Sequence, residues 1–250
     1  KDLAGPTNTS HPSGASAMMV ESPVALLCHP ASVSRDLVPT QQVLAGAGAR
    51  IVSLLGPEHG IDAAAQDMEG VGSEVAAGPA GPPVYSLYGE DFDSLRPAPA
   101  MFHDAEWLVV DLQDVGARYY TYVWTALMAV EEALKAHLQV LILDRPNPLG
   151  GTDAGVEGGG VQPGQESFVG YHDVAVRHGM TLAEIVTMAL AERGVRVGHT
   201  RGSSDKGEEP VPAKPVPGSV AEVHQLLCPA ASPRRPSLPA WDNRCTRTPA

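Results

Sequence analysis

The side chains that could do chemistry are concentrated in three short segments, each of which follows an apolar run. These segments read GPEHG at 56–60, DLQDVGARYYTY at 111–122 and DRPNPLGG at 144–151. Carboxylates, histidine and tyrosine can move protons, and arginine can bind anions. Because the sequence has no G-x-S-x-G nucleophile elbow, the set favours hydrolysis by general acid catalysis over acyl transfer.

Glycoside hydrolysis is the natural reaction for this set of residues. It usually needs two carboxyl groups, about 5–5.5 Å apart for retention or about 6.5–9.5 Å for inversion, with tyrosine-nucleophile and substrate-assisted exceptions. The sequence does not fix this separation. A metal-dependent hydrolase using His29, Glu58, His59, Asp111 and Asp114 is an alternative, but no spacing such as HExxH supports it, so we expect no metal ion.

Glu58 and His59 lie between Pro57 and Gly60, which predict a tight turn around two titratable groups. We expect Glu58 to be catalytic, with capping of the next helix as the alternative. His59 is either part of the chemistry or a hydrogen-bonded support.

The remaining charged residues also have structural alternatives. Asp111 and Asp144 end their strands, where aspartate commonly caps a helix or binds loop amides. Arg118, Arg145 and Arg177 are suited to gripping a carboxylate with two hydrogen bonds. We expect one of the three arginines to bind substrate, and composition does not say which.

Three tyrosines and a histidine also have both a structural and a functional interpretation. Tyr119, Tyr120 and Tyr122 begin a predicted helix, so some of them belong to the cleft wall or the core. His178 precedes another helix, where it either positions a loop or contacts the ligand.

Four apolar runs bounded by turn residues predict buried parallel strands. They cover residues 24–28, 50–55, 107–111 and 139–144. Residues 36–47 predict a helix capped by Asp36, and residues 119–137 predict a helix with an apolar stripe at Val123, Leu127, Val130 and Leu134. Strand, helix and strand in alternation predict an α/β parallel sheet with helices on both faces.

A later helix is marked by its own capping signals. Thr181 and Glu184 form a T-x-x-E capping box, and Gly194 ends the helix after about Arg193.

Parallel strands end on one edge of a sheet, which is where α/β folds bind ligands. The polar residues that follow the strands should therefore converge on one cleft. They are Glu58, His59, Asp111, Gln113, Asp114, Arg118, Tyr119, Tyr122, Asp144, Arg145 and Asn147.

Composition excludes several classes of partner. The net charge is −12, from 17 basic and 29 acidic residues, so nucleic acid is not an expected partner. No window reaches the roughly 20 apolar residues of a membrane span. The glycines at 155–164 follow no strand and there is no P-loop, so we expect no cofactor. The oligomeric state is not readable.

The three cysteines and the two ends of the chain indicate where the predicted domain lies and what does not stabilise it. Cys28, Cys228 and Cys245 form no disulfide framework, and Cys28 is expected to be a small buried hydrophobe. Residues 1–22 are rich in Ser, Gly, Pro and Ala, so we expect this segment to be disordered. The segment shows no secretory signal, and we assign no localisation to the protein. Residues 23–196 form the predicted catalytic-face domain. Residues 197–250 are rich in proline and poor in apolar side chains, so we expect a disordered or non-native tail without stable strands or helices beyond a turn around 220–227.

Five ordered motifs carry a family resemblance. GPEHG, DLQDVGARYYTY, DRPNPLGG, SFVG at 167–170 and RHGMTLAE at 177–184 resemble the exo-β-N-acetylmuramidase family, formerly a domain of unknown function, over about residues 24–194. The resemblance implies a Rossmann-like domain followed by a smaller α/β domain. It also implies release of non-reducing terminal N-acetylmuramic acid from peptidoglycan fragments, by proteins that are often exported.

The resemblance also implies roles for individual residues. Glu58 is implied as the catalytic acid, and His59, Asp114 and Tyr122 are the other catalytic candidates. The substrate-binding candidates are Asp111, Gln113, Arg118, Asp144, Arg145, Asn147, Arg177 and His178. The family's second domain is not recognisable after Arg196, so we expect it to be truncated or replaced. An inactive domain that only binds muramyl sugars is therefore an alternative.

Overall fold

The computed structural model describes residues 21–61, 81–89, 92–151, 155–195 and 223–227. These residues build one parallel sheet with the strand order β3-β2-β1-β4-β5-β6. The strands are β1 (Pro23–Cys28), β2 (Arg50–Gly56), β3 (Val84–Ser86), β4 (Trp107–Asp111), β5 (Gln139–Asp144) and β6 (Val223–Leu227). This is the order of a doubly wound Rossmann fold, whose direction of winding reverses between β1 and β4. The predicted α/β class is confirmed.

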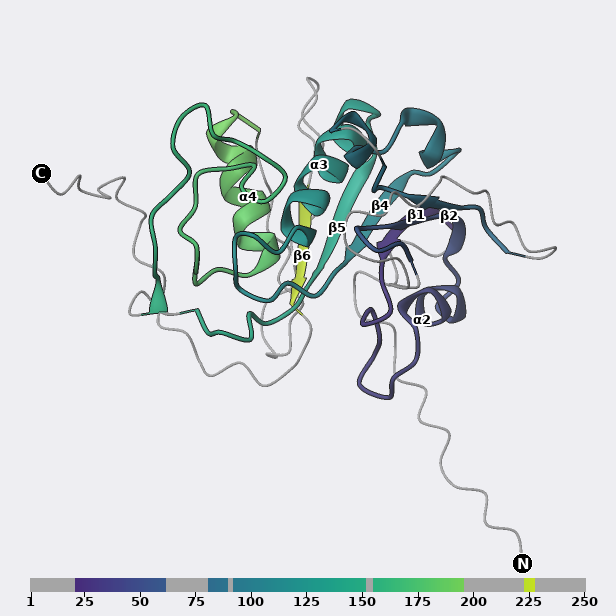
Figure 1. The fold of residues 1–250 in the computed structure, drawn as a ribbon. Coiled ribbons are helices and arrows are strands. Elements are labelled where there is room, and N and C mark those ends of the chain that lie inside the picture. The colour runs from purple at the N-terminus through teal and green to yellow at the C-terminus, as the bar shows by residue number, and fades with distance from the viewer. Residues whose placement is uncertain (1–20, 62–80, 90–91, 152–154, 196–222, 228–250) are drawn as a thin grey trace, which may run out of the picture.

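Helices cover both faces of the sheet, as the alternation predicts. Helices α3 (Tyr122–Lys135) and α4 (Leu182–Glu192) lie on one face, and α2 (Thr40–Gly46) lies on the other (Figure 1). Two 3₁₀ turns, η1 (Asp93–Leu95) and η2 (Pro99–Phe102), precede β4.

The two faces of β1 show why the sheet is buried on both sides. Ala25 and Leu27 join the core under α3 and α4, whereas Val24 and Leu26 join the core under α2, which contributes Leu44. Successive residues of a strand point to opposite faces, so a strand with two covered faces must be apolar throughout. All six residues of β1 are buried.

The start of α2 corrects the expected helix at 36–47. The helix begins at Thr40, after Pro39 at φ −54° and ψ 138°. Leu37 has a positive φ of 59°, so the chain turns before the helix and Asp36 caps nothing. Leu44 is buried, but Val43, expected to face the core, is exposed.

The other two helices agree with their patterns. In α3 the stripe residues Val123, Leu127 and Val130 are fully buried. In α4 both hydrogen bonds of the Thr181–Glu184 capping box are present, and Gly194 follows at φ +79°. Local capping chemistry placed this helix to within a residue at each end.

Strand β6 corrects the expected tail. Residues 223–227 pair in parallel with β5, from Val140↔Val223 to Asp144↔Leu227. The expectation that 197–250 contains no strand is wrong for these five residues. The remainder of 197–250 and the segment 1–20 lie outside the described residues.

Among the described helices, none is long and apolar enough to cross a bilayer.

Candidate active site

The carboxyl edge of the sheet brings together residues from four strands. Cys28 and Asp111 are partners in the β1–β4 register, so His29, just after β1, lies beside the segment that follows Asp111. Glu58 follows β2, and Arg145 follows β5. Residues that follow four parallel strands therefore lie along one edge of the sheet, and His29 is among them.

Glu58 lies in a turn whose backbone is tightly constrained. The amide of Gly60 donates to the carbonyl of Pro57 at 2.9 Å, and His59 and Gly60 both have positive φ. A Cβ atom on Gly56 would approach the backbone nitrogen of Ile61 to 2.6 Å, so only glycine fits there. The turn thus holds Glu58 directly beyond the end of β2.

The side chain of Glu58 faces the start of α3. The Thr121 hydroxyl donates to Glu58 Oε2 at 2.5 Å, and the Tyr122 hydroxyl lies 3.4 Å from the Glu58 carbonyl oxygen. A hydroxyl can donate or accept, so the Thr121 contact can hold the carboxyl group in either protonation state.

Three aromatic rings lie close together beside this contact. The Tyr122 ring lies 4.6 Å from the Tyr120 ring and 5.0 Å from the His29 ring, centroid to centroid. Burial is the main cause that raises the pKa of Tyr122, with the neighbouring Tyr120 and Glu58 adding to it. Tyr122 therefore keeps its proton near neutral pH and acts as a hydrogen-bonding group.

Two carboxylates act on Tyr120. Burial raises its pKa, the hydrogen bond with Tyr122 opposes that rise, and the charges of Asp114 and Glu58 both add to it. Asp114 and Glu58 therefore both lie within electrostatic range of Tyr120.

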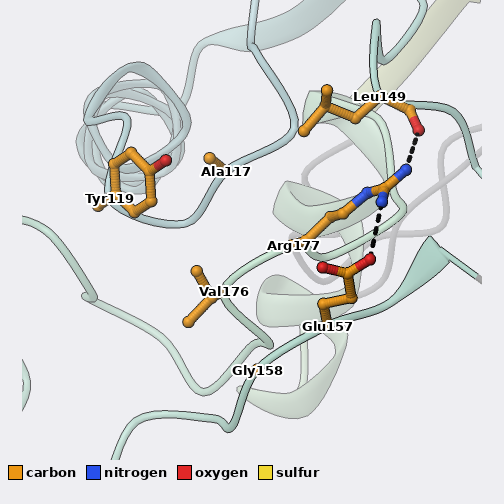
Figure 2. A pocket seen from close by; sticks show the side chains of 7 residues that line it. All are labelled: Ala117, Tyr119, Leu149, Glu157, Gly158, Val176 and Arg177. Carbon is orange, nitrogen blue, oxygen red and sulfur yellow. Dashed lines mark hydrogen bonds and ion pairs between the residues drawn. The ribbon is translucent and has the colours of Figure 1, made fainter.

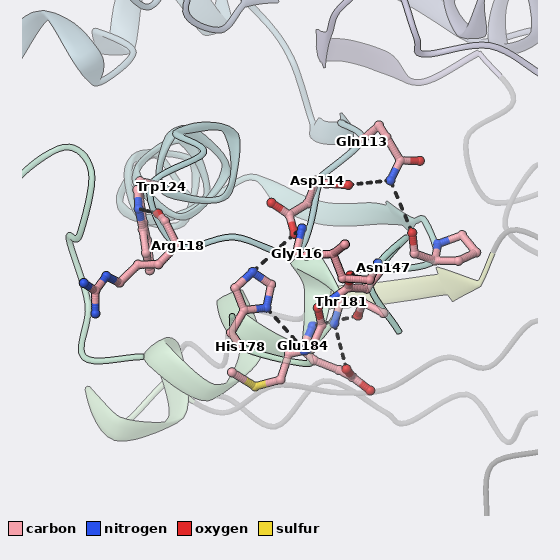
Figure 3. Close-up of polar contacts among 12 residues, drawn as sticks. Gln113, Asp114, Gly116, Arg118, Trp124, Asn147, His178, Thr181 and Glu184 are labelled. Carbon is pink, nitrogen blue, oxygen red and sulfur yellow. Dashed lines mark hydrogen bonds and ion pairs between the residues drawn. The ribbon is translucent and has the colours of Figure 1, made fainter. Parts of the chain in front are cut away.

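Asp114 forms a buried pair with His178. Its Oδ2 atom accepts the Gly116 amide at 2.8 Å and lies 3.3 Å from His178 Nε2 (Figure 3). His178 Nδ1 accepts the Met180 amide at 3.3 Å, so in the neutral ring the proton is on Nε2. The other oxygen of Asp114, Oδ1, is buried without a hydrogen-bond partner among the described residues.

Asp111 and Arg145 neutralise each other. Arg145 Nε and Nη2 donate to the two Asp111 oxygens at 2.6 and 2.9 Å, and Nη2 also donates to the Val33 carbonyl at 3.0 Å. The Thr40 hydroxyl donates to the same carboxylate, which is 1% exposed. The geometry favours a structural role for both residues at the sheet edge.

Asp144 is engaged in capping α4, as its structural alternative predicts. It accepts from the Thr181 hydroxyl at 2.7 Å and from the Ala183 amide at 3.1 Å.

Asn147 and Gln113 hold loops together. Asn147 donates to the Met180 carbonyl at 2.8 Å, and Gln113 Nε2 donates to the carbonyls of Asp114 and Pro146 at 2.6 and 3.2 Å. Gly116 packs against Asn147 so closely, at φ +84°, that a Cβ atom would lie 2.3 Å from Asn147 Oδ1.

Arg177 pairs with a carboxylate, whereas Arg118 contacts only carbonyl oxygens among the described residues. Arg177 donates to Glu157 at 3.0 Å and to the Leu149 carbonyl at 2.8 Å, in the wall of an open hollow of about 420 Å³ beside Tyr119 (Figure 2). Arg118 Nη1 donates to the carbonyls of Gly159 and Val174, and its guanidinium points away from the Asp114–His178 pair (Figure 3). Within the described ranges, Arg118 has no carboxylate partner.

Two residues of this edge, Thr121 and His29, are not among the predicted cleft residues, although His29 is named in the metal alternative. Thr121 stands among three tyrosines and looked like part of a helix start, and its contact with Glu58 joins residues 63 positions apart. His29 did carry a signal, because it is the polar residue directly after the first apolar run.

The residues named in the metal alternative are not assembled into a ligand set. In the part of the chain that is described, no group of three or more His, Cys, Asp or Glu side chains is placed to hold a metal ion.

Comparison with known proteins gives a consistent set of similarities. The family model described as exo-beta-N-acetylmuramidase NamZ, N-terminal, matches residues 24–202. The chain is 37% identical over 166 residues to the peptidoglycan beta-N-acetylmuramidase NamZ of Bacillus subtilis (strain 168), covering 66% of this chain and 39% of that protein. The chain thus spans well under half the length of this relative.

Two crystal structures of DUF1343 family proteins from Bacteroides fragilis NCTC 9343 share the fold. One has a TM-score of 0.60 at 35% identity, covering 71% of this chain and 43% of its own. The other has a TM-score of 0.56 at 27% identity, covering 71% and 44%.

Proposed function

The chain belongs to the family of the N-terminal region of exo-β-N-acetylmuramidase NamZ, and we propose that it carries the catalytic face of an exo-acting glycoside hydrolase. The proposed reaction releases non-reducing terminal N-acetylmuramic acid from peptidoglycan-derived muramyl glycans. The observation that carries the proposal is the placement of Glu58, which lies at the carboxyl edge of the sheet, held by Thr121 and beside Tyr122.

In this proposal Glu58 gives its proton to the glycosidic oxygen as the bond to the anomeric carbon breaks, so that the leaving sugar departs as an alcohol. The oxygen of a water molecule ends on the anomeric carbon of the released N-acetylmuramic acid. Asp114 is proposed as the second carboxyl group, since it acts on Tyr120 together with Glu58 and has one oxygen without a described partner. Tyr122 and His59 are proposed to orient the sugar against Glu58. General acid catalysis typically contributes about 10²–10⁴-fold in rate.

The test uses the disaccharide N-acetylmuramyl-β-1,4-N-acetylglucosamine and measures free N-acetylmuramic acid. The full chain should release the sugar, and Glu58→Gln should lower the rate by about 10²–10⁴-fold, because the amide keeps the shape but has no acidic proton. Glu106→Gln is the matched control: Glu106 directly precedes β4 at the opposite edge of the sheet and should leave the rate unchanged.

Two outcomes count against the proposal in different ways. Near-normal release by Glu58→Gln removes the acid role from Glu58. Binding of the disaccharide by the unaltered chain without any release supports the alternative of a domain that only binds muramyl sugars.

A further inference from the structure

His29 lies where the winding of the sheet reverses. It directly follows β1, and its Nε2 atom accepts the backbone amide of Gln113, just beyond β4, at 3.1 Å. In open α/β sheets the crevice between the two strands at this reversal is the usual place for a ligand. The proposed function assigns no role to His29.

The hydrogen bond to Gln113 fixes the tautomer of His29. An amide always donates, so Nε2 must be the unprotonated nitrogen and Nδ1 carries the proton. Across residues 21–61, 81–89, 92–151 and 155–195, Nδ1 has no hydrogen-bond partner, and the ring is only partly buried. His29 therefore presents an N–H donor beside the Tyr122 ring.

The surroundings of His29 keep the ring neutral. Burial lowers its pKa to about 4, Asp111 opposes the shift and Arg145 adds to it. Asp111 is paired with Arg145, so the opposite effects of these two charges on the pKa of His29 partly cancel, and burial decides the direction. Near neutral pH the ring accepts from Gln113 and donates from Nδ1 at the same time.

We propose that His29 is a substrate-binding residue whose Nδ1–H donates a hydrogen bond to a neutral oxygen, a hydroxyl or acetamido carbonyl, of a sugar bound in the crevice between β1 and β4. The inference rests on the proposed function, because it assumes that a sugar occupies this edge. It adds a donor at the β1–β4 crevice to a site otherwise built from Glu58 and the start of α3.

The chemistry of the pair selects a neutral oxygen over a carboxylate. A carboxylate at Nδ1 would stabilise the imidazolium form, and an imidazolium ring has two donors and no acceptor. The imidazolium form leaves the Gln113 amide without an acceptor at the end of β4, so the hydrogen bond to Gln113 favours a neutral oxygen as the partner of Nδ1. The oxygen that His29 binds is thus one that N-acetylmuramic acid and N-acetylglucosamine share.

Two variants separate the two nitrogens of the ring. In His29→Gln the side-chain oxygen can reach the place of Nε2 and keep the Gln113 bond, while the Nδ1 donor is lost. In His29→Asn the amide nitrogen takes the place of Nδ1 and keeps the donor, while the Gln113 amide loses its acceptor. Each variant is titrated with N-acetylmuramic acid and with N-acetylglucosamine by NMR, and its melting temperature is measured.

His29→Gln should weaken both sugars by the same factor, roughly 3- to 10-fold, as expected for one neutral hydrogen bond. His29→Asn should bind within about twofold of the unaltered chain but melt at a lower temperature. Unchanged binding by His29→Gln, an equal loss in His29→Asn, or a loss confined to N-acetylmuramic acid overturns the inference. If the unaltered chain binds neither sugar, the proposed function fails and the inference fails with it.

Discussion

Arg118 differs from the other two candidate arginines in what balances its charge. Arg145 is paired with Asp111 and Arg177 with Glu157, whereas the described contacts of Arg118 are to carbonyl oxygens. An arginine without a carboxylate partner is the one best able to take up an anionic ligand group. We therefore expect Arg118 to bind the lactyl carboxylate that distinguishes N-acetylmuramic acid from N-acetylglucosamine.

Arg118→Ala should weaken binding of N-acetylmuramic acid by roughly 10- to 100-fold, the range for a charge-assisted hydrogen bond, and leave N-acetylglucosamine little changed. Isothermal titration measures the dissociation constant of each sugar, and the change in the ratio of the two constants tests the expectation. Arg177→Ala is the control, because its charge is already balanced by Glu157. Equal losses on both sugars would mean that Arg118 serves only to hold the loops at Gly159 and Val174.

The residues of the site divide into those that motif spacing could predict and those that it could not. Glu58, Asp111 and Asp144 each end or follow a strand, so their common edge follows from parallel strands. The partners within that edge do not follow from spacing, because Thr121 meets Glu58 and Arg145 meets Asp111 only after the chain has folded. Asp111 and Asp144 are both predicted to bind substrate, but Asp111 pairs with Arg145 and Asp144 caps the start of α4.

At the scale of elements, prediction succeeded where local chemistry decides the outcome. The strand at 107–111 and the strand at 139–144 agree with β4 and β5 residue for residue. Strand β3 has three residues, too few for a periodic signal, and it forms only by pairing with β2. Helix α2 shows the converse, because Pro39 and the turn at Leu37 override an apparent aspartate cap.

Helix α4 offers a direct test of capping in this fold. Thr181→Ala removes a hydroxyl that accepts from the Glu184 amide and donates to Asp144. We expect a loss of about 1–2 kcal/mol in the free energy of unfolding, measured by urea denaturation. Thr187→Ala, in the interior of the same helix, is the control and should change stability by less than about 0.5 kcal/mol. Equal changes in the free energy of unfolding for the two variants would show that the Thr181 cap does not stabilise the fold more than an interior threonine does.

At the scale of the whole molecule, β6 adds a strand from near the C-terminus to the sheet, next to β5. Proline-rich composition predicts a segment without strands at 197–250, but a strand can be stabilised by an open neighbour far away in the sequence. The outer edge of β5 is such a neighbour, since among the described strands only β6 pairs with it on that side. Five residues are enough to cover it.

The pairing of β6 with β5 is tested by placing a proline inside β6. In Gln225→Pro the backbone amide opposite Ile142 is lost, and proline is tolerated poorly inside a paired strand. We expect hydrogen exchange to become faster for the remaining β6 amides and for those β5 amides that face β6. Leu26 in the central strand β1 should keep its protection, because two strands, β4 and β5, separate it from β6. If β6 amides exchange at the rate of an unstructured peptide in the unaltered chain, the five-residue strand is not formed in solution, and the composition-based expectation for the tail is correct.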